Sequence, residues 1–294
     1  MINTNLLYRC YDQTGEAATW LSGLQCLLWV DIDNGILHQY HADNQSVKDH
    51  TFPEVITSII PWKGHDKEVI LAMKNRFIVY HLEKKTYKTL IELSCLHPQW
   101  RTNDCKAAPE GRIWCGVMHR SEHNGNASLY CVENDLSLAQ VLQQQSIPNG
   151  IVWNREGDRM YYADSGRGCI EEFAYDRLTG GIYFLRTAIQ VPPEYGVPDG
   201  MTISADGLLW VAHWGGFGVY VWNPANGQLV RKIEVPVPNV ASCTFGGKGQ
   251  LFITTALDGL SEEEKELYPL SGSLFVADVP GVIPGENHYP FITG

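Results

Sequence analysis

The feature that most constrains the fold is a two-strand unit that recurs six times at nearly constant spacing. Each unit is an apolar, aromatic-rich strand, a short turn and a second strand, and the units begin at residues 27, 69, 112, 160, 208 and 251. The intervals of 42, 43, 48, 48 and 43 residues match the length of one four-stranded propeller blade. Six such units account for nearly all of the 294 residues. We therefore predict an all-β, six-bladed β-propeller with four-stranded antiparallel blades.

Turn chemistry and the scarcity of helix signals agree with this prediction. Gly follows Asp or Asn between strand candidates, as at Asn34-Gly35 and Asp206-Gly207, where positive φ angles are needed. Ser261, followed by three glutamates, predicts a short surface helix over 260–267 inside the last blade. The strand candidate 5–11 has no partner of its own. We expect it to pair with the last blade and close the ring, giving a single domain over residues 1–294.

Composition and charge exclude several classes of protein. The net charge of -11 repels phosphate backbones, so a nucleic-acid partner is not expected. The chain has no basic, apolar leader at its start and no apolar run of about 20 residues, so we expect a soluble cytoplasmic protein without a membrane partner. The eight cysteines form no C-x-x-C pair, which favours reduced, buried thiols. No feature of the sequence indicates an oligomeric state.

The candidate chemistry lies in oxygen-bearing side chains at repeated positions. Pro148-Asn149-Gly150 and Pro198-Asp199-Gly200 lie 50 residues apart with similar flanks, and we expect both in loops at one end of the propeller axis. A third such loop carries Glu16. Three oxygen ligands at one axis suit Ca²⁺, Mg²⁺, Mn²⁺, Zn²⁺ or Fe²⁺. The alternatives are ordinary hairpin turns for the two tripeptides and a solvated carboxylate for Glu16.

A fourth predicted loop, 100–104, places Arg101 and Asn103 at the same level as these ligands. Arg101 either contacts a substrate or pairs with Asp104. His119 and His213 are candidates for lining the pocket or acting as bases, and a structural role is the alternative for each. Ser165 and Ser204 lack the setting of a nucleophile elbow, which argues against a serine hydrolase mechanism.

Several motifs occur in the order found in the gluconolactonase/regucalcin (senescence marker protein) family, and the resemblance covers essentially the full length. They are Gly15-Glu16 before Trp20, Leu28-Trp29-Val30-Asp31-Ile32, Arg101-Thr102-Asn103-Asp104, Pro148-Asn149-Gly150, Pro198-Asp199-Gly200 and Trp214-Gly215-Gly216. The resemblance implies a six-bladed propeller with one divalent metal held by Glu16, Asn149 and Asp199. It also implies that Arg101 and Asn103 bind the substrate, a small sugar lactone.

Two departures from the family pattern affect the backbone near these residues. Ala17-Ala18 stands where the family usually has Gly-Pro, and Cys105 stands where it usually has Gly. Neither removes a ligand. The stretches 212–218, 236–247 and 257–261 resemble bacterial aldonolactonases more than animal regucalcins.

The sequence therefore predicts a metal-dependent hydrolase that opens an aldono-1,4- or 1,5-lactone of a pentonate or hexonate. The metal polarises the carbonyl, and Asp199 is the expected base for the attacking water. Two alternatives stay open: a Ca²⁺-binding, regucalcin-like regulatory protein with little turnover, and a non-catalytic propeller scaffold. The sequence leaves the sugar, its ring size and the metal undecided.

Overall fold

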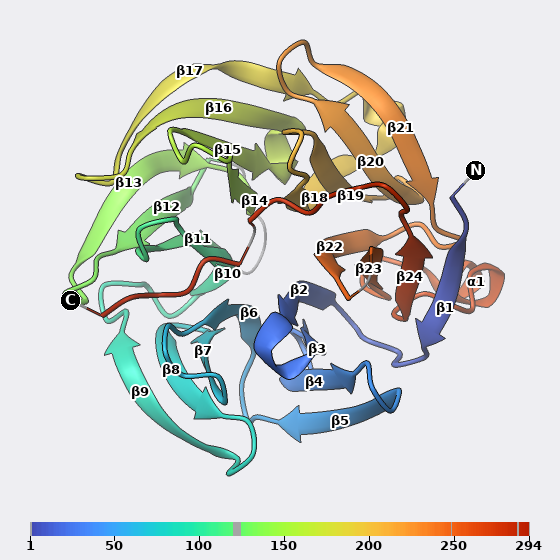
Figure 1. Ribbon diagram of the computed structural model, residues 1–294, viewed down its shortest axis with the longest axis horizontal. Coiled ribbons are helices and arrows are strands. Elements are labelled where there is room, and N and C mark those ends of the chain that lie inside the picture. The colour runs from blue at the N-terminus through green and yellow to red at the C-terminus, as the bar shows by residue number, and fades with distance from the viewer. Residues whose placement is uncertain (1, 120–124, 248, 287, 294) are drawn as a thin grey trace.

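Six four-stranded antiparallel sheets surround a central axis in the computed structural model (Figure 1). The structure describes residues 2–119, 125–247, 249–286 and 288–293. Within these residues the chain is almost entirely β-strand, with a single α-helix. The predicted all-β, six-bladed propeller is confirmed.

Each blade runs from an inner strand at the axis to an outer strand at the rim. The strands of blades 1 to 3 are, from the axis outward, β2 (Gly15–Leu21), β3 (Cys26–Asp31), β4 (Ile36–His41) and β5 (Ser46–Thr51); β6 (Ile56–Pro61), β7 (Glu68–Met73), β8 (Arg76–His81) and β9 (Thr86–Glu92); and β10 (Trp100–Ala107), β11 (Ile113–His119), β12 (Ala127–Val132) and β13 (Leu138–Gln145). Those of blades 4 to 6 are β14 (Pro148–Trp153), β15 (Arg159–Asp164), β16 (Cys169–Asp176) and β17 (Gly181–Gln190); β18 (Val197–Ile203), β19 (Leu209–Trp214), β20 (Gly218–Asn223) and β21 (Gln228–Glu234); and β22 (Val240–Gly246), β23 (Gln250–Thr255), β24 (Leu274–Asp278) and β1 (Thr4–Tyr8).

Blade 6 is built from both ends of the chain. Strand β1 pairs antiparallel with β24, with Thr4 opposite Ala277 and Leu6 opposite Phe275. The first strand of the chain therefore forms the rim of the last blade, and this pairing covers an edge of β24 that would otherwise be exposed.

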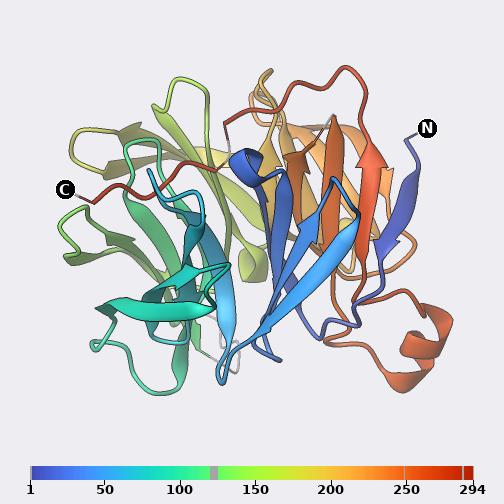
Figure 2. The ribbon, with the colours of Figure 1, turned by 60° about the horizontal axis from the view of Figure 1, so that its bottom comes forward.

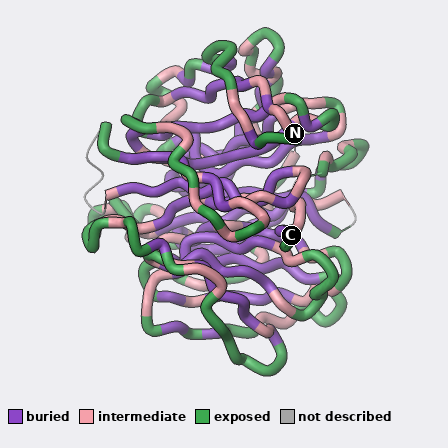
Figure 3. Tube along the Cα trace, turned by 90° about the vertical axis from the view of Figure 1, so that its left-hand side faces the viewer, coloured by how far each residue is buried: buried purple, intermediate pink, exposed green. Residues whose placement is uncertain are grey.

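The apolar core lies between neighbouring blades, and the middle strands are buried on both faces (Figure 3). Three of the largest fully buried side chains, Trp29, Trp114 and Trp210, occupy the second strand of blades 1, 3 and 5. Burying a large apolar side chain contributes roughly 1.5–3 kcal/mol, so each of these positions holds its blade against the next. The apolar, aromatic-rich strands that recur in the sequence are the second strands of the six blades.

The two ends of the axis differ in what covers them (Figure 2). The short helix α1 (Glu262–Leu267) lies at one end, and its predicted Ser261 cap is confirmed as a capping box with Glu264. At the other end, the C-terminal segment after β24 crosses the face of the ring. It bonds to blade 5 through Gly285 N and Ile203 O, 3.0 Å apart, and to blade 2 through Phe291 N and Pro61 O, 2.9 Å apart.

The remaining connections include three short 3₁₀ turns, η1 (Ser22–Leu24), η2 (Ser165–Arg167) and η3 (Pro193–Tyr195). All eight cysteines are free thiols. Within the described parts of the chain, no helix combines the length and apolarity needed to cross a membrane.

Candidate functional site

Every inner strand carries one extra residue relative to its neighbour. On β18, for example, Pro198 pairs with His213 and Met201 pairs with Val211. Two residues of β18 between these pairs therefore lie opposite a single residue of β19. The same irregularity interrupts β2, β6, β10, β14 and β22 in the first half of each strand. Such β-bulges bend a strand and re-aim its side chains. Each inner strand therefore has a bulge at a similar level of the ring, and the side chains at these six bulges can face the common axis.

Four of the predicted site residues lie at these bulges. Glu16, Asn103, Asn149 and Asp199 come from blades 1, 3, 4 and 5, and their exposed fractions are 9%, 7%, 7% and 5%. Asn103 Nδ2 donates to Asn149 Oδ1 over 3.1 Å. Blades far apart in the sequence thus bring these side chains together, as the repeat predicted.

The expectation that these residues lie in loops was wrong. Pro148-Asn149-Gly150 lies inside β14, Pro198-Asp199-Gly200 lies inside β18, and 100–104 lies inside β10. The two glycines make no turn; they are needed because the inner strands approach so closely. A Cβ on Gly150 would lie 2.6 Å from Asp199 O, and a Cβ on Gly200 would lie 2.9 Å from Ala241 O.

The two acidic candidates, Glu16 and Asp199, lie close enough to shift each other's pKa. Burial raises the pKa of Glu16 above its usual range, and repulsion from Asp104 adds to that shift. Burial likewise raises the pKa of Asp199, with further repulsion from Glu16 and Asp104. Two buried carboxyl groups in contact ionise together only when a cation compensates them. Their environment is suited to holding a cation.

The backbone beside Glu16 explains one departure from the family pattern. Ala17 has φ of 55°, in the left-handed region that favours glycine, and its N–H donates to Glu16 Oε2 over 2.7 Å. The alanine therefore adopts a left-handed conformation at a cost of roughly 1–2 kcal/mol. The second departure, Cys105, is buried and contacts Cys115 with 3.1 Å between the sulfur atoms.

Arg101 and Asn103 are joined at the edge of this cluster. Arg101 Nη1 donates to Asn103 Oδ1 over 2.6 Å and to the carbonyl oxygen of Thr102 over 2.9 Å. The positive charge of Arg101 also lowers the pKa of Glu16, against the larger effects of burial and Asp104. The guanidinium is therefore electrostatically coupled to the carboxyl pair.

The two histidine candidates differ in their surroundings. His119 lies at the end of β11 opposite Trp100, with Nε2 3.4 Å from Gln99 Oε1. His213 is fully buried, and its Nδ1 lies 2.8 Å from the carbonyl oxygen of Tyr195 while its Nε2 accepts from Trp222 Nε1 over 3.2 Å. The structure corrects the expectation that His213 lines the pocket, because both of its ring nitrogens are engaged within blade 5.

Two half-buried charged residues near the axis, Asp104 and Lys106, were not among the predicted site residues. Lys106 Nζ donates to the carbonyl oxygen of Met201 over 2.9 Å, which joins β10 to β18 across the axis. Burial lowers the pKa of Lys106, and the negative charge of Asp104 opposes that shift. Both residues line a cavity of about 20 Å³, together with Cys105, Cys243 and Ser242. The motif Asp104-Cys105-Lys106 shows two charges, but only the structure shows that both face the axis.

Ser165 is a further residue that sequence reasoning missed. It lies at the start of η2, and its hydroxyl group joins Asn149 to the carbonyl oxygen of Pro198. Its partners lie 16 and 33 residues away, so no local pattern could have indicated it.

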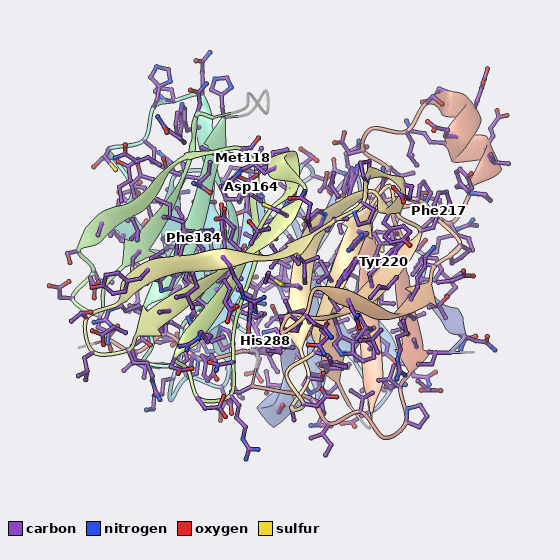
Figure 4. All side chains as sticks on the ribbon, turned by 90° about the horizontal axis from the view of Figure 1, so that it is seen from above. Met118, Asp164, Phe184, Phe217, Tyr220 and His288 are labelled. Atoms are coloured by element: carbon purple, nitrogen blue, oxygen red, sulfur yellow. The ribbon has the colours of Figure 1, made fainter. Side chains whose placement is uncertain are left out.

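A second cavity, larger than the first, lies at the other end of the axis. Its volume is about 590 Å³, and its lining includes Trp20, Trp62 and Phe245. In Figure 4, His288, which also lines this cavity, lies toward one face, whereas Asp164 lies toward the face that carries α1. Strand β2 passes from Glu16 to Trp20, so the cavity and the carboxyl pair lie at opposite ends of the inner strands. None of the predicted site residues lines it.

The donor set determines which ions fit. The described residues contain no group of three or more His, Cys, Asp or Glu arranged to hold a metal ion. The axial cluster offers two carboxylates and an amide oxygen, a set that hard divalent cations accept when water completes the shell. The residues present therefore fit an oxygen-ligated divalent cation.

Comparison with known proteins gives the family of the chain. The family model described as "SMP-30/Gluconolactonase/LRE-like region" matches residues 14–257. A Bacillus subtilis protein named as a sugar lactone lactonase, YvrE, is 33% identical over 267 residues, covering 90% of this chain and 91% of the relative. Regucalcin of Xenopus laevis is 30% identical over 269 residues, covering 89% of each chain.

Among solved structures, a calcium-binding regucalcin from Agrobacterium tumefaciens superposes with a TM-score of 0.91 at 22% identity, covering 99% of this chain and 97% of the other. At that identity the likeness supports the fold alone. The match of the family model spans more than half of the 294 residues and includes all of the axial residues described above. The chain belongs to the SMP-30/gluconolactonase/LRE-like family.

Proposed function

We propose that this protein is a metal-dependent lactonase that hydrolyses the ring ester of an aldono-lactone to the free aldonic acid. The observation that carries the proposal is the convergence of Glu16, Asn149 and Asp199 on one axis, in a chain of this family. The relative named as a sugar lactone lactonase supports the substrate class. A sugar lactone is the proposed partner, and the eight free thiols agree with the cytoplasmic location expected from the sequence.

Glu16, Asn149 and Asp199 would hold one divalent cation through their side-chain oxygens. When bound, the cation supplies polarisation of the lactone carbonyl and stabilises the negative charge that develops on its oxygen. Its identity among Ca²⁺, Mg²⁺, Mn²⁺, Zn²⁺ and Fe²⁺ is part of the test below.

Asp199 is the proposed base. Its carboxylate accepts a proton as water adds to the carbonyl carbon, and it returns that proton to the ring oxygen when the ring C–O bond breaks. The product is the open hydroxy acid, and Asp199 regains its original protonation state. Burial beside Glu16 keeps this carboxyl group away from bulk water.

Arg101 and Asn103 are the proposed substrate-binding residues. The guanidinium and the amide bond to each other, so a sugar hydroxyl group that contacts one is also oriented by the other. Such positioning aligns the carbonyl carbon with the attacking water. His119, at the end of β11, is the remaining candidate for the pocket wall.

The test combines elemental analysis of the purified protein with acid release from four lactones. The panel is D-xylono-1,4-lactone, L-arabinono-1,4-lactone, D-galactono-1,4-lactone and D-glucono-1,5-lactone, each measured against its spontaneous hydrolysis. We expect enzyme-dependent acid release that a chelator abolishes and one added divalent cation restores. Calcium binding without acid release would favour a regucalcin-like regulatory protein. Neither binding nor release would leave the propeller scaffold as the better description.

A further inference from the structure

A chain of side-chain hydrogen bonds crosses three inner strands near the axis. Arg101 Nη1 donates to Asn103 Oδ1 over 2.6 Å, and Asn103 Nδ2 donates to Asn149 Oδ1 over 3.1 Å. Asn149 Nδ2 then donates to Ser165 Oγ over 2.8 Å, and the hydroxyl group of Ser165 donates to the carbonyl oxygen of Pro198 over 2.6 Å. The chain therefore links blades 3, 4 and 5 and ends beside Asp199.

The direction of every bond in this chain is set by its two ends. A guanidinium has only donors, and a carbonyl oxygen has only lone pairs. Ser165 donates its single O–H to the carbonyl oxygen of Pro198. Its oxygen can therefore only accept a hydrogen bond from Asn149. The amide of Asn149 must then turn its NH₂ toward Ser165, which leaves its oxygen facing Asn103 and the axis.

We infer that Ser165 is a positioning residue that holds the Asn149 amide with its oxygen available to the cation. The inference rests on the proposed function, because it takes Asn149 as a ligand. With the amide flipped, Asn149 would present an NH₂ group, which has no lone pair for a cation. Because Ser165 also bonds to the residue before Asp199, one hydroxyl group connects two of the three ligands.

A purely structural role predicts a different outcome, and Ser204 provides the matched control. Ser204 is 4% exposed, against 5% for Ser165. Its hydroxyl group likewise accepts one bond, from Trp210 Nε1 over 3.1 Å, and it donates to Asp206 Oδ1 over 2.5 Å, with the carbonyl oxygen of Leu208 3.3 Å away. All of these partners are residues of blade 5, and none is a proposed ligand. Loss of either hydroxyl group should lower thermal stability, but only loss of the Ser165 hydroxyl should weaken cation binding.

The experiment titrates Ca²⁺ and Mn²⁺ alone into metal-free wild type, Ser165→Ala, Ser165→Cys and Ser204→Ala by calorimetry. We expect Ser165→Ala and Ser165→Cys to raise the Kd about 10- to 100-fold, the usual effect of losing a hydrogen bond that orients a ligand. Ser204→Ala should leave the Kd within about two-fold, because distant sites act independently. The cysteine variant preserves side-chain volume, so it serves if the alanine variant fails to fold.

A second arm asks whether Ser165 acts through the amide. In Asn149→Asp the two carboxylate oxygens are equivalent, so either can face the cation and no amide needs orienting. Adding Ser165→Ala to that variant should change its Kd by less than about three-fold, a non-additivity that a double-mutant cycle measures.

Equal Kd values for Ser165→Ala, Ser165→Cys and wild type would overturn the inference and leave the proposed function intact. An undiminished effect of Ser165→Ala in the Asn149→Asp background would also overturn it. Wild type that binds no divalent cation and releases no acid from any lactone would overturn the proposed function, and the inference with it.

Discussion

Strands β18 and β22 are neighbours on the ring with the same backbone irregularity and different chemistry. Each has one extra residue at its bulge, and each is buried there. At the corresponding position, β18 carries Asp199 and β22 carries Ala241, and on β6 the bulge carries Thr57. The bulge is therefore a feature of the propeller fold, whereas the side chain at the bulge differs from blade to blade. A propeller of this kind can gain or lose a donor at one position without rebuilding its backbone.

The largest effect is expected from removing the carboxylate charge that distinguishes β18 from β22. Asp199→Asn keeps the shape and an oxygen donor but cannot accept a proton from water. We expect turnover of the best lactone in the panel to fall about 10³-fold, within the range for loss of a general base. Steady-state kinetics with the restoring cation at saturation measure this effect.

The control is Ala241→Ser at the same position of β22, which should change turnover by less than about three-fold because it removes no interaction with the reacting atoms. Near-normal turnover in Asp199→Asn would refute the assignment of the base.

The next largest effect concerns the glycines that follow the two donors. Gly150→Ala places a methyl group 2.6 Å from Asp199 O and 2.7 Å from Met201 Cγ, so strands must move apart. We expect a loss of about 3 kcal/mol in unfolding free energy, and about 2 kcal/mol for Gly200→Ala, whose nearest contacts are 2.9 Å. Denaturant titration checks both values.

Gly23→Ala is the matched control for the glycine variants, since nothing lies within 4 Å of its Cβ position. Its unfolding free energy should stay within about 0.5 kcal/mol of wild type. If Gly150→Ala were equally neutral, the close approach of the inner strands would not explain the glycine.

A third difference lies opposite the bulges, where His213 pairs with the start of the β18 bulge and Thr255 with that of β22. Burial lowers the pKa of His213 to about 4. Between the ordinary pKa of about 6.5 and this value the unfolded chain binds the proton and the folded chain does not. The contribution of His213 is therefore present above pH 6.5 and is lost as the pH falls toward 4.

Wild type should lose about 2 kcal/mol more than His213→Gln between pH 6.5 and 4.5, because one pKa unit corresponds to about 1.4 kcal/mol. Denaturant titrations of both proteins at a series of pH values measure the difference. Parallel pH profiles would show that folding leaves the pKa of His213 unchanged.

The smallest expected effect comes from the bulge of β6. The hydroxyl group of Thr57 lies 2.6 Å from that of Thr102, which itself donates to the carbonyl oxygen of Met73. Thr57→Val removes one buried hydrogen bond and should cost about 1 kcal/mol of stability. Cation affinity should stay within about two-fold, because the pair lies outside the proposed ligand set. A large loss of affinity would mean that β6 takes part in the site.

Much of the fold could be predicted from the sequence because each blade repeats the same pattern. The spacing of the second strands predicted six blades, and Ser261 predicted the cap of α1. The bulges could not be predicted, because Pro-Asn-Gly has the local chemistry of a turn. Glycine is needed at position 150 because the backbone oxygen of Asp199, 49 positions later in the chain, leaves no room for a Cβ atom.

For the candidate site, the residues could be predicted from the sequence but their surroundings could not. The sequence indicated which residues carry donor oxygens, and the structure brings Glu16, Asn149 and Asp199 to one axis. The environment of His213 was not predictable, since Tyr195 and Trp222 engage it through tertiary packing. Ser165 was missed for the same reason, because its role depends on the orientation of an amide in another strand.

The pairing of β1 with β24 determines when during synthesis the ring of blades can be completed. Strand β1 leaves the ribosome first and waits until residues 274–278 have been made before it gains its partner. Until then blade 6, which lies between the blades of Glu16 and Asp199, lacks its two outer strands. An unfinished chain therefore lacks the complete ring that surrounds the proposed cation site. Under the proposed function, cation binding by nascent chains would report that the last blade is complete.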